Sequence, residues 1–111
     1  MIHFLHKPAS KKQIDEMLQI LETYIKLAVD IEKKVAAGGG ALHADCEAVL
    51  LEKGSVQENI WGADWIPASQ EVTFEALINI MPKQNNMSMV IQDEDIRISV
   101  REVVKSLFKH D

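Results

Sequence analysis

The hydrophobic period of the chain changes twice along its length, and this change constrains the fold more than any other feature. After Ser10, apolar residues recur every three or four positions, as they do on one face of an amphipathic α-helix. Ser10 and Gln13 also have the spacing of a capping box, which favours a helix start at this point. From about residue 25 the period becomes two, which is typical of strands with one buried face. The helical period returns after Asp93, a favoured N-cap residue, so the pattern predicts a helix on each side of a β-region.

The β-region divides into segments at glycine, proline and polar turn residues. Three consecutive glycines, Gly38 to Gly40, separate the first two alternating segments, which we expect to form a hairpin. Pro67 separates a second pair. The expected strands are residues 25–31, 42–50, 59–66 and 72–80, with shorter candidates at 87–91 and 2–5. The pattern predicts an α+β fold, a four- or five-stranded mainly antiparallel meander with one N-terminal and one C-terminal helix packed on one face.

Length and charge limit the classes of protein to which the chain can belong. Residues 1–111 are expected to form one domain, which is long enough to bury a core without disulfides. A single cysteine, Cys46, excludes an intramolecular disulfide and is expected to be a buried, unreactive thiol. The net charge of −5 argues against broad binding to nucleic acid or to anionic membranes. No apolar stretch has the length of a membrane helix and the first residues do not resemble a signal peptide, so we expect a cytoplasmic protein.

Two tryptophans are expected to decide which face of the sheet is buried. Trp61 and Trp65 are four residues apart and therefore lie on the same face of a strand. Burying an indole removes about 200 Å² from water, which is worth on the order of 5 kcal/mol before opposing costs. We therefore expect both indoles to lie under the two helices. The opposite face would then collect seven polar residues: Asp30, Glu32, His43, Asp45, Glu47, Asp64 and Glu75.

This polar face has the residue types of a divalent-cation site. His43, Asp45 and Glu47 alternate along one expected strand and would lie on the same side of it. Asp64, on a neighbouring strand, would add a fourth ligand. Carboxylates suit Mn²⁺, Mg²⁺ and Ca²⁺, and the imidazole favours Mn²⁺ among them. With a bound metal the face would have the groups needed for water activation and hydrolysis, whereas a solvated polar face is the common alternative for an antiparallel sheet.

The leading functional hypothesis is a non-enzymatic binding or protein-interaction module, and the metal-dependent hydrolase is the alternative. A binding module would use either the acidic face or the sheet edge near residues 87–91. Its partner is expected to be another protein or a second copy of the chain, as a homodimer. The candidate binding residues are Asp30, Glu32, Glu75 and Asn79.

A basic stripe on the C-terminal helix offers a weaker indication of a partner. Its four residues, which recur every four positions, are Arg97, Arg101, Lys105 and Lys109. Such a stripe is suited to an acidic partner or a phosphate backbone, but it also occurs as a solvated helix flank. Because no aromatic residues are interleaved with it, nucleic-acid binding is not the favoured interpretation.

Three segments of the chain, residues 43–62, 74–82 and 86–97, resemble a family of small bacterial proteins catalogued only as a domain of unknown function. The resemblance extends from about Ala28 to the last helix. It implies no activity, and no catalytic or binding residue is carried over from it. The chain departs from the family pattern at Met81, Met87 and Met89, where relatives often have arginine, and at Cys46, where they have an acid. If those arginines bind an anionic ligand in relatives, the resemblance implies that this chain lacks that function.

Overall fold

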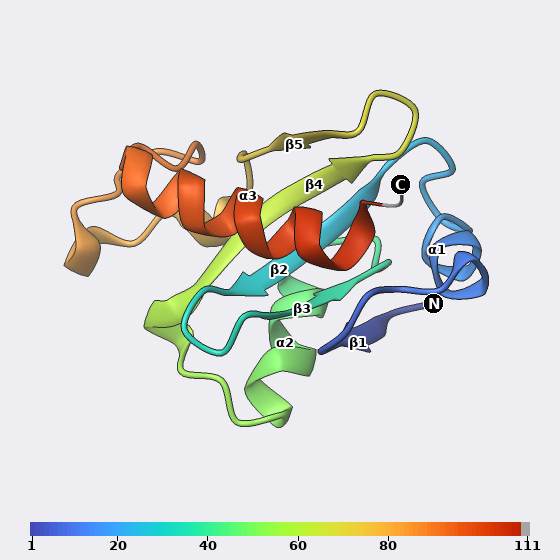
Figure 1. The fold of residues 1–111 in the computed structure, drawn as a ribbon. Helices are drawn as coiled ribbons and strands as arrows, with labels where there is room; N and C mark the ends of the chain where they lie inside the picture. The colour runs from blue at the N-terminus through green and yellow to red at the C-terminus, as the bar shows by residue number, and fades with distance from the viewer. Residues whose placement is uncertain (110–111) are drawn as a thin grey trace.

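One antiparallel sheet and three α-helices make up the part of the chain that the structure, a computed structural model, describes, which is residues 1–109 (Figure 1). The elements follow one another as β1 (His3–Leu5), α1 (Lys11–Met17), β2 (Ile25–Asp30), β3 (Val35–Gly38), α2 (His43–Glu52), β4 (Ile60–Ile66), β5 (Glu71–Thr73) and α3 (Glu94–Phe108). The strand order in the sheet is β1-β3-β2-β4-β5, and each neighbouring pair is antiparallel. The predicted α+β class with a five-stranded antiparallel sheet is confirmed.

Both terminal helices begin where the sequence predicted. The Ser10 hydroxyl accepts from the backbone N–H of Gln13, while the Gln13 side chain accepts from the backbone N–H of Ser10, which completes the capping box of α1. The Asp93 carboxylate accepts from two backbone N–H groups in the first turn of α3. Side-chain caps therefore define both helix starts.

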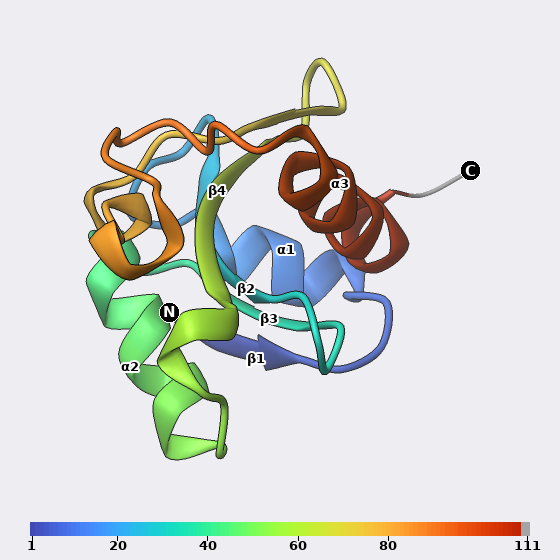
Figure 2. The same cartoon turned by 90° about the vertical axis from the view of Figure 1, so that its left-hand side faces the viewer.

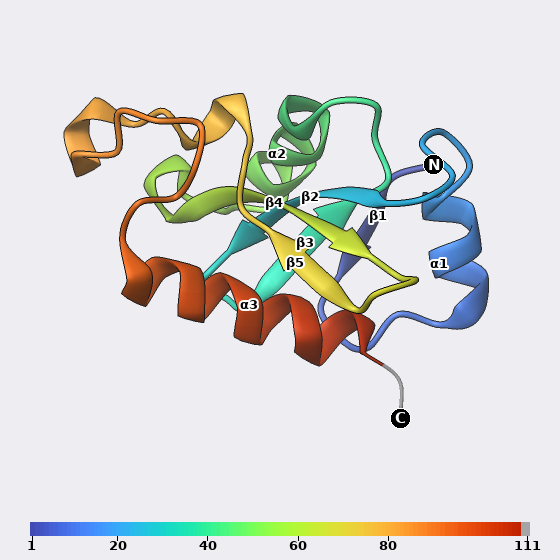
Figure 3. The ribbon, with the colours of Figure 1, turned by 90° about the horizontal axis from the view of Figure 1, so that it is seen from above.

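The two faces of the sheet are covered by different helices. Seen along the strands, α3 lies on one face and α2 on the other (Figure 2). Seen from above, α1 lies at one end of the sheet, and the long segment between β5 and α3 lies at the other end (Figure 3). No helix among the described residues combines the length and the apolar character that crossing a membrane requires.

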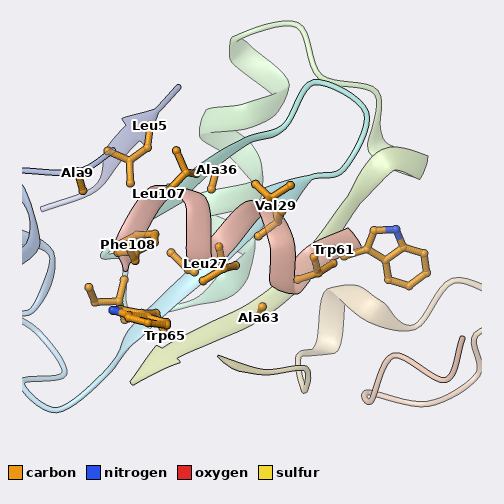
Figure 4. Packing of buried hydrophobic residues seen from close by; sticks show 14 of the residues in the cluster. Leu5, Ala9, Leu27, Val29, Ala36, Trp61, Ala63, Trp65, Leu107 and Phe108 are labelled. Atoms are coloured by element: carbon orange, nitrogen blue, oxygen red, sulfur yellow. The ribbon is translucent and has the colours of Figure 1, made fainter. Parts of the chain in front are cut away.

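The main core lies on the α3 face and contains both tryptophans, as predicted (Figure 4). Trp65 packs against Phe108 of α3 with ring centroids 5.9 Å apart. Met17 of α1 belongs to the same cluster, so residues of both terminal helices pack with the tryptophans. A smaller cluster lies on the opposite face, between α2 and the sheet; its buried members are Ala28, Ala37, Cys46, Leu50 and Ile60.

The predicted strand at residues 42–50 is wrong, because this segment forms α2. The hairpin partner of β2 is instead β3, a short strand of small residues that precedes the last glycines. Cys46 and Leu50 are buried and four residues apart, as on one helix face, whereas Ala44 and Ala48 are exposed. Alanine, leucine and glutamate are also strong helix formers. At Gly39 the backbone adopts a φ of +105° close to Met17, so the chain leaves the sheet through a conformation that favours glycine.

The predicted strand at residues 72–80 is largely wrong. Only Glu71–Thr73 pairs with β4, and the chain then continues in short 3₁₀ turns, including Leu77–Asn79 and Pro82–Gln84. The candidate strand at 87–91 contributes one isolated bridge, between Glu75 and Val90. The strand expected at 59–66 is confirmed as β4, and the candidate at 2–5 is confirmed as the edge strand β1.

Candidate functional site

A row of polar residues crosses the sheet on the face opposite the tryptophans. In the strand register, Lys26 of β2 lies opposite Asp64 of β4, and Asp64 lies opposite Thr73 of β5. Successive side chains of a strand point to opposite faces, so Asp64 projects away from the face that carries Trp65. This polar row therefore lies on the same side of the sheet as α2.

His43, the first residue of α2, joins this row through Asp64. Its Nε2 lies 2.8 Å from Asp64 Oδ1 and 3.2 Å from the carbonyl oxygen of Ala63. The Thr73 hydroxyl donates to the second carboxylate oxygen, Asp64 Oδ2, at 3.0 Å. The side chains of His43 and Asp64 are only 11% and 15% exposed. The three residues thus form a partly buried chain of hydrogen bonds that fixes the position of the imidazole.

The hydrogen bonds of His43 also determine which ring nitrogen carries the proton. Both partners of Nε2 are acceptors, so Nε2 must be the donor. In the neutral ring the other nitrogen, Nδ1, then has a free lone pair. Within residues 1–109, Nδ1 forms no hydrogen bond. The neutral imidazole therefore presents a hydrogen-bond acceptor in a fixed orientation.

A cleft of about 590 Å³ opens beside the His43–Asp64 pair. Its polar lining includes the row described above, together with Tyr24 and Glu75. Its apolar lining comes from two walls, the start of α2 and the segment after β5; the larger apolar residues are Leu42, Leu77, Ile78 and Met89. A volume of this size falls in the range of small-molecule sites, which combine apolar walls with a few polar groups.

Gly62 and Asn79 fix the wall that follows β5. A Cβ on Gly62 would overlap Ala76 Cβ and lie 3.0 Å from Ile78 Cγ1, so the wall rests directly on the bare backbone of β4. The Asn79 side chain accepts from the N–H of Gly62 and donates to its carbonyl oxygen. Asn79 also donates to the carbonyl oxygens of Phe74 and Met89. It is completely buried, so the structure places this predicted binding residue in a supporting position beneath the cleft.

Of the four predicted metal ligands, the structure brings His43 and Asp64 together but not Asp45 or Glu47. Asp45 is exposed on α2, and Glu47 forms a hydrogen bond with Gln57 instead of joining the His43–Asp64 pair. Burial raises the pKa of Glu47, and a hydrogen bond with Gln57 partly opposes that increase. In the described part of the chain, no group of three or more histidine, cysteine or acidic side chains is placed to hold a metal ion.

The remaining predicted binding residues lie in different environments. Asp30 is buried, and its carboxylate accepts from the backbone N–H groups of Glu32 and Lys33 and from the hydroxyl of Ser55 at 2.6 Å. Glu32 itself is exposed in the turn that follows β2. Glu75 lines the cleft. Only Glu75 of these residues is therefore available to a ligand in the cleft.

Cys46 is buried in α2, and burial raises the pKa of its thiol, as expected of an unreactive cysteine. Its Sγ donates to the carbonyl oxygen of Lys26 at 3.5 Å.

Two residues of the basic stripe on α3 form contacts within the fold. Arg97 donates to the carbonyl oxygen of Ile91, and the Arg101 guanidinium lies 5.3 Å from the centre of the Phe74 ring.

Thr73 is the residue of this site that the sequence prediction missed. The sequence predicts Thr73 in a strand that pairs with residues 59–66, but it gives the Thr73 side chain no partner. The position of the turn at residues 67–70 could have identified this contact, because a hairpin closed by that turn places Thr73 opposite Asp64. The hairpin register therefore predicts the contact once the turn position is known.

Comparison with known proteins gives a match at the level of a family. A family model described as "Protein of unknown function (DUF5674)" matches residues 3–107. No curated protein and no solved structure matches the chain. The family match spans every strand and nearly all of the last helix, but its description assigns no activity to any residue.

Proposed function

Because the chain belongs to the family of proteins of unknown function DUF5674, we propose a function from the site itself: a binding module that takes a small, partly apolar ligand in the cleft beside His43. The observation that carries this proposal is that one cleft of about 590 Å³ combines apolar walls with His43, whose Nδ1 forms no hydrogen bond within residues 1–109. Apolar walls supply binding energy through buried area, and a fixed polar group supplies orientation.

The cleft is also preorganised, which supports binding over a passive surface hollow. The imidazole is held by Asp64, the carboxylate of Asp64 is held by Thr73, and the wall after β5 is held by Asn79. A ligand that enters such a site does not have to order these groups on arrival. This lowers the entropic cost of binding.

Filling the cleft from one wall tests the proposal. Ala44 and Ala48 are both exposed and lie one turn apart on α2, but only Ala44 lines the cleft. Amide chemical-shift mapping by nuclear magnetic resonance with a set of small aromatic and aliphatic fragments should place the binders at the cleft. In Ala44→Trp the indole occupies the cleft, so we expect the affinity of these binders to fall by at least about tenfold, or 1.4 kcal/mol.

The matched control is Ala48→Trp, which adds the same side chain to the same helix outside the cleft. We expect this variant to bind the fragments as the unmodified chain does. Binders that scatter over the surface, or that retain their affinity in Ala44→Trp, would contradict the proposal.

A second candidate function, self-association, is favoured by the exposed apolar side chains of the segment between β5 and α3. Leu77 is 71% exposed and Met87 is 67% exposed. Exposed apolar side chains that gather on one segment are typical of interaction surfaces. We propose a second copy of the chain as the partner for this surface.

A further inference from the structure

The polar groups of the cleft differ in whether they are free to meet a ligand. Both oxygens of the Asp64 carboxylate have partners, one from His43 and one from Thr73. The Thr73 hydroxyl uses its proton in that bond, and one of the three N–H groups of the Lys26 ammonium donates to the carbonyl oxygen of Ala41 at 3.1 Å. The acceptor at His43 Nδ1 has no such partner within residues 1–109.

Nδ1 is not sealed inside the protein. Among the described residues, the indole nitrogen of Trp61 is the one buried side-chain nitrogen or oxygen that lacks a hydrogen-bond partner. His43 Nδ1, which also lacks a partner, is therefore accessible, and His43 lines the cleft. A ligand that fills the cleft would cover this nitrogen, and leaving it without a donor would cost the ligand affinity.

The charges around the cleft favour the same kind of ligand. Two acidic residues, Asp64 and Glu75, line it together with one lysine, Lys26, so the acidic side chains outnumber the basic one. The chain as a whole carries a net charge of −5. An anionic ligand would meet like charge here, whereas a ligand with a hydrogen-bond donor would meet acceptors.

We propose that the cleft selects neutral or cationic ligands that join an apolar body to an O–H or N–H donor, and that His43 Nδ1 accepts this donor. The inference rests on the proposed binding function and adds the chemical class of the ligand. Asp64 acts as a positioning residue, because its bond to Nε2 keeps the proton on that nitrogen and leaves the lone pair on the cleft side of the pair.

A matched pair of probes tests this selection. The compounds 4-ethylphenol and 4-ethylanisole share one apolar body, but the ether lacks the O–H donor. Titration of each compound, followed by amide chemical shifts of the cleft residues, gives the two dissociation constants. We expect the phenol to bind about three- to tenfold more tightly than the ether, which is the range for one hydrogen bond between neutral groups.

The variant His43→Phe keeps a flat ring at this position and removes the acceptor. We expect the ratio of the ether's dissociation constant to the phenol's to fall to about one in this variant, because phenol affinity decreases while ether affinity is retained.

A second measurement needs no variant. In the unmodified chain at a pH where His43 is neutral, the ¹⁵N shifts of the imidazole should identify Nε2 as protonated and Nδ1 as unprotonated.

The outcomes separate the inference from the function on which it rests. Equal affinity of phenol and ether at the cleft of the unmodified chain, a protonated Nδ1, or cleft binders that exclude the phenol would overturn the inference and leave the binding function intact. A fragment set that yields no cleft binder would overturn both.

Discussion

At the scale of single residues, Asp64 controls the candidate site because each of its carboxylate oxygens has a defined partner. His43 and Thr73 reach it from α2 and β5, two elements that are separated in the sequence by β4. The carboxylate of Asp64 on β4 therefore sets the position of the His43 imidazole, which belongs to α2. Glu47 illustrates a different case, a partly buried acid that forms a hydrogen bond with Gln57.

Replacing Glu47 should change the dependence of stability on pH. Burial raises the pKa of Glu47 above its usual value of 4.5, so the folded chain binds more protons than the unfolded chain between 4.5 and the raised value. The free energy of unfolding therefore falls as pH rises through this interval. Glu47→Gln removes this loss, and we expect a higher Tm than that of the unmodified chain at pH 7 and no difference near pH 4. Thermal unfolding followed by circular dichroism measures both values.

Glu52→Gln is the control, since Glu52 is exposed on the same helix. This change should leave the Tm unaltered at both pH values. A lower Tm for Glu47→Gln at pH 7 would show that the carboxylate of Glu47 stabilises the fold instead.

At the scale of elements, the segment between β5 and α3 replaces strand pairing with side-chain hydrogen bonds. β5 pairs with β4 only from Asp64 onward, and the Asn79 side chain bonds the backbone of Gly62 where a neighbouring strand would otherwise lie. The Asn86 side chain donates to three carbonyl oxygens of the same segment and accepts from the N–H of Gln92. Two buried amides thus hold one wall of the cleft in place.

The contact of this wall with Gly62 can be tested by a double-mutant cycle. In Gly62→Ala the new methyl group overlaps Ala76 Cβ and crowds Ile78, and we expect the free energy of unfolding to fall by about 1–3 kcal/mol. Adding Ala76→Gly removes the overlapping atom and should recover part of this loss. Urea unfolding of the four proteins gives the coupling energy. Additive effects of the two changes would show that the wall does not rest on β4 as described.

At the scale of the whole molecule, the cleft exists because the α2 face of the sheet is only partly covered. The large cluster under α3 fills its own face, whereas α2 buries a small cluster, and the segment after β5 covers the Gly62 end of β4. The polar row of Lys26, Asp64 and Thr73 lies between these two covers. Figure 2 shows the layer arrangement, with α2 and α3 on opposite sides of the sheet, and this arrangement sets the position of the cleft.

The assembly state is a prediction at this scale. If a second copy covers Leu77 and Met87, light scattering should give about twice the chain mass of 12.5 kDa, and Leu77→Ser or Met87→Ser should shift the population toward the single chain. Ile20→Ser is the control, because Ile20 is 52% exposed and follows α1, a helix that lies at the other end of the sheet from this segment (Figure 3). A mass of 12.5 kDa that does not change with concentration would contradict self-association through this surface.

Features of the fold that depend on near neighbours in the chain could be predicted from the amino-acid sequence. The caps at Ser10 and Asp93 and the helical periods after them specify α1 and α3. The spacing of Trp61 and Trp65 specifies one buried face of β4, which in turn places Asp64 on the other face. Hydrogen bonds within helices and alternation within strands are local, so the residues that specify them are close together in the sequence.

Whether residues 42–50 form a strand or a helix depends on tertiary contacts, and so does the set of residues that make up the site. The segment's apolar residues fit a period of two, but contacts of Cys46 and Leu50 with the sheet favour a helix. Side chains two positions apart on a helix point in directions that differ by about 200°, so Asp45 points away from His43. On a strand the same two side chains would have lain on one face. His43 and Asp64 meet because α2 packs across β4, a contact between distant parts of the chain that no local period specifies.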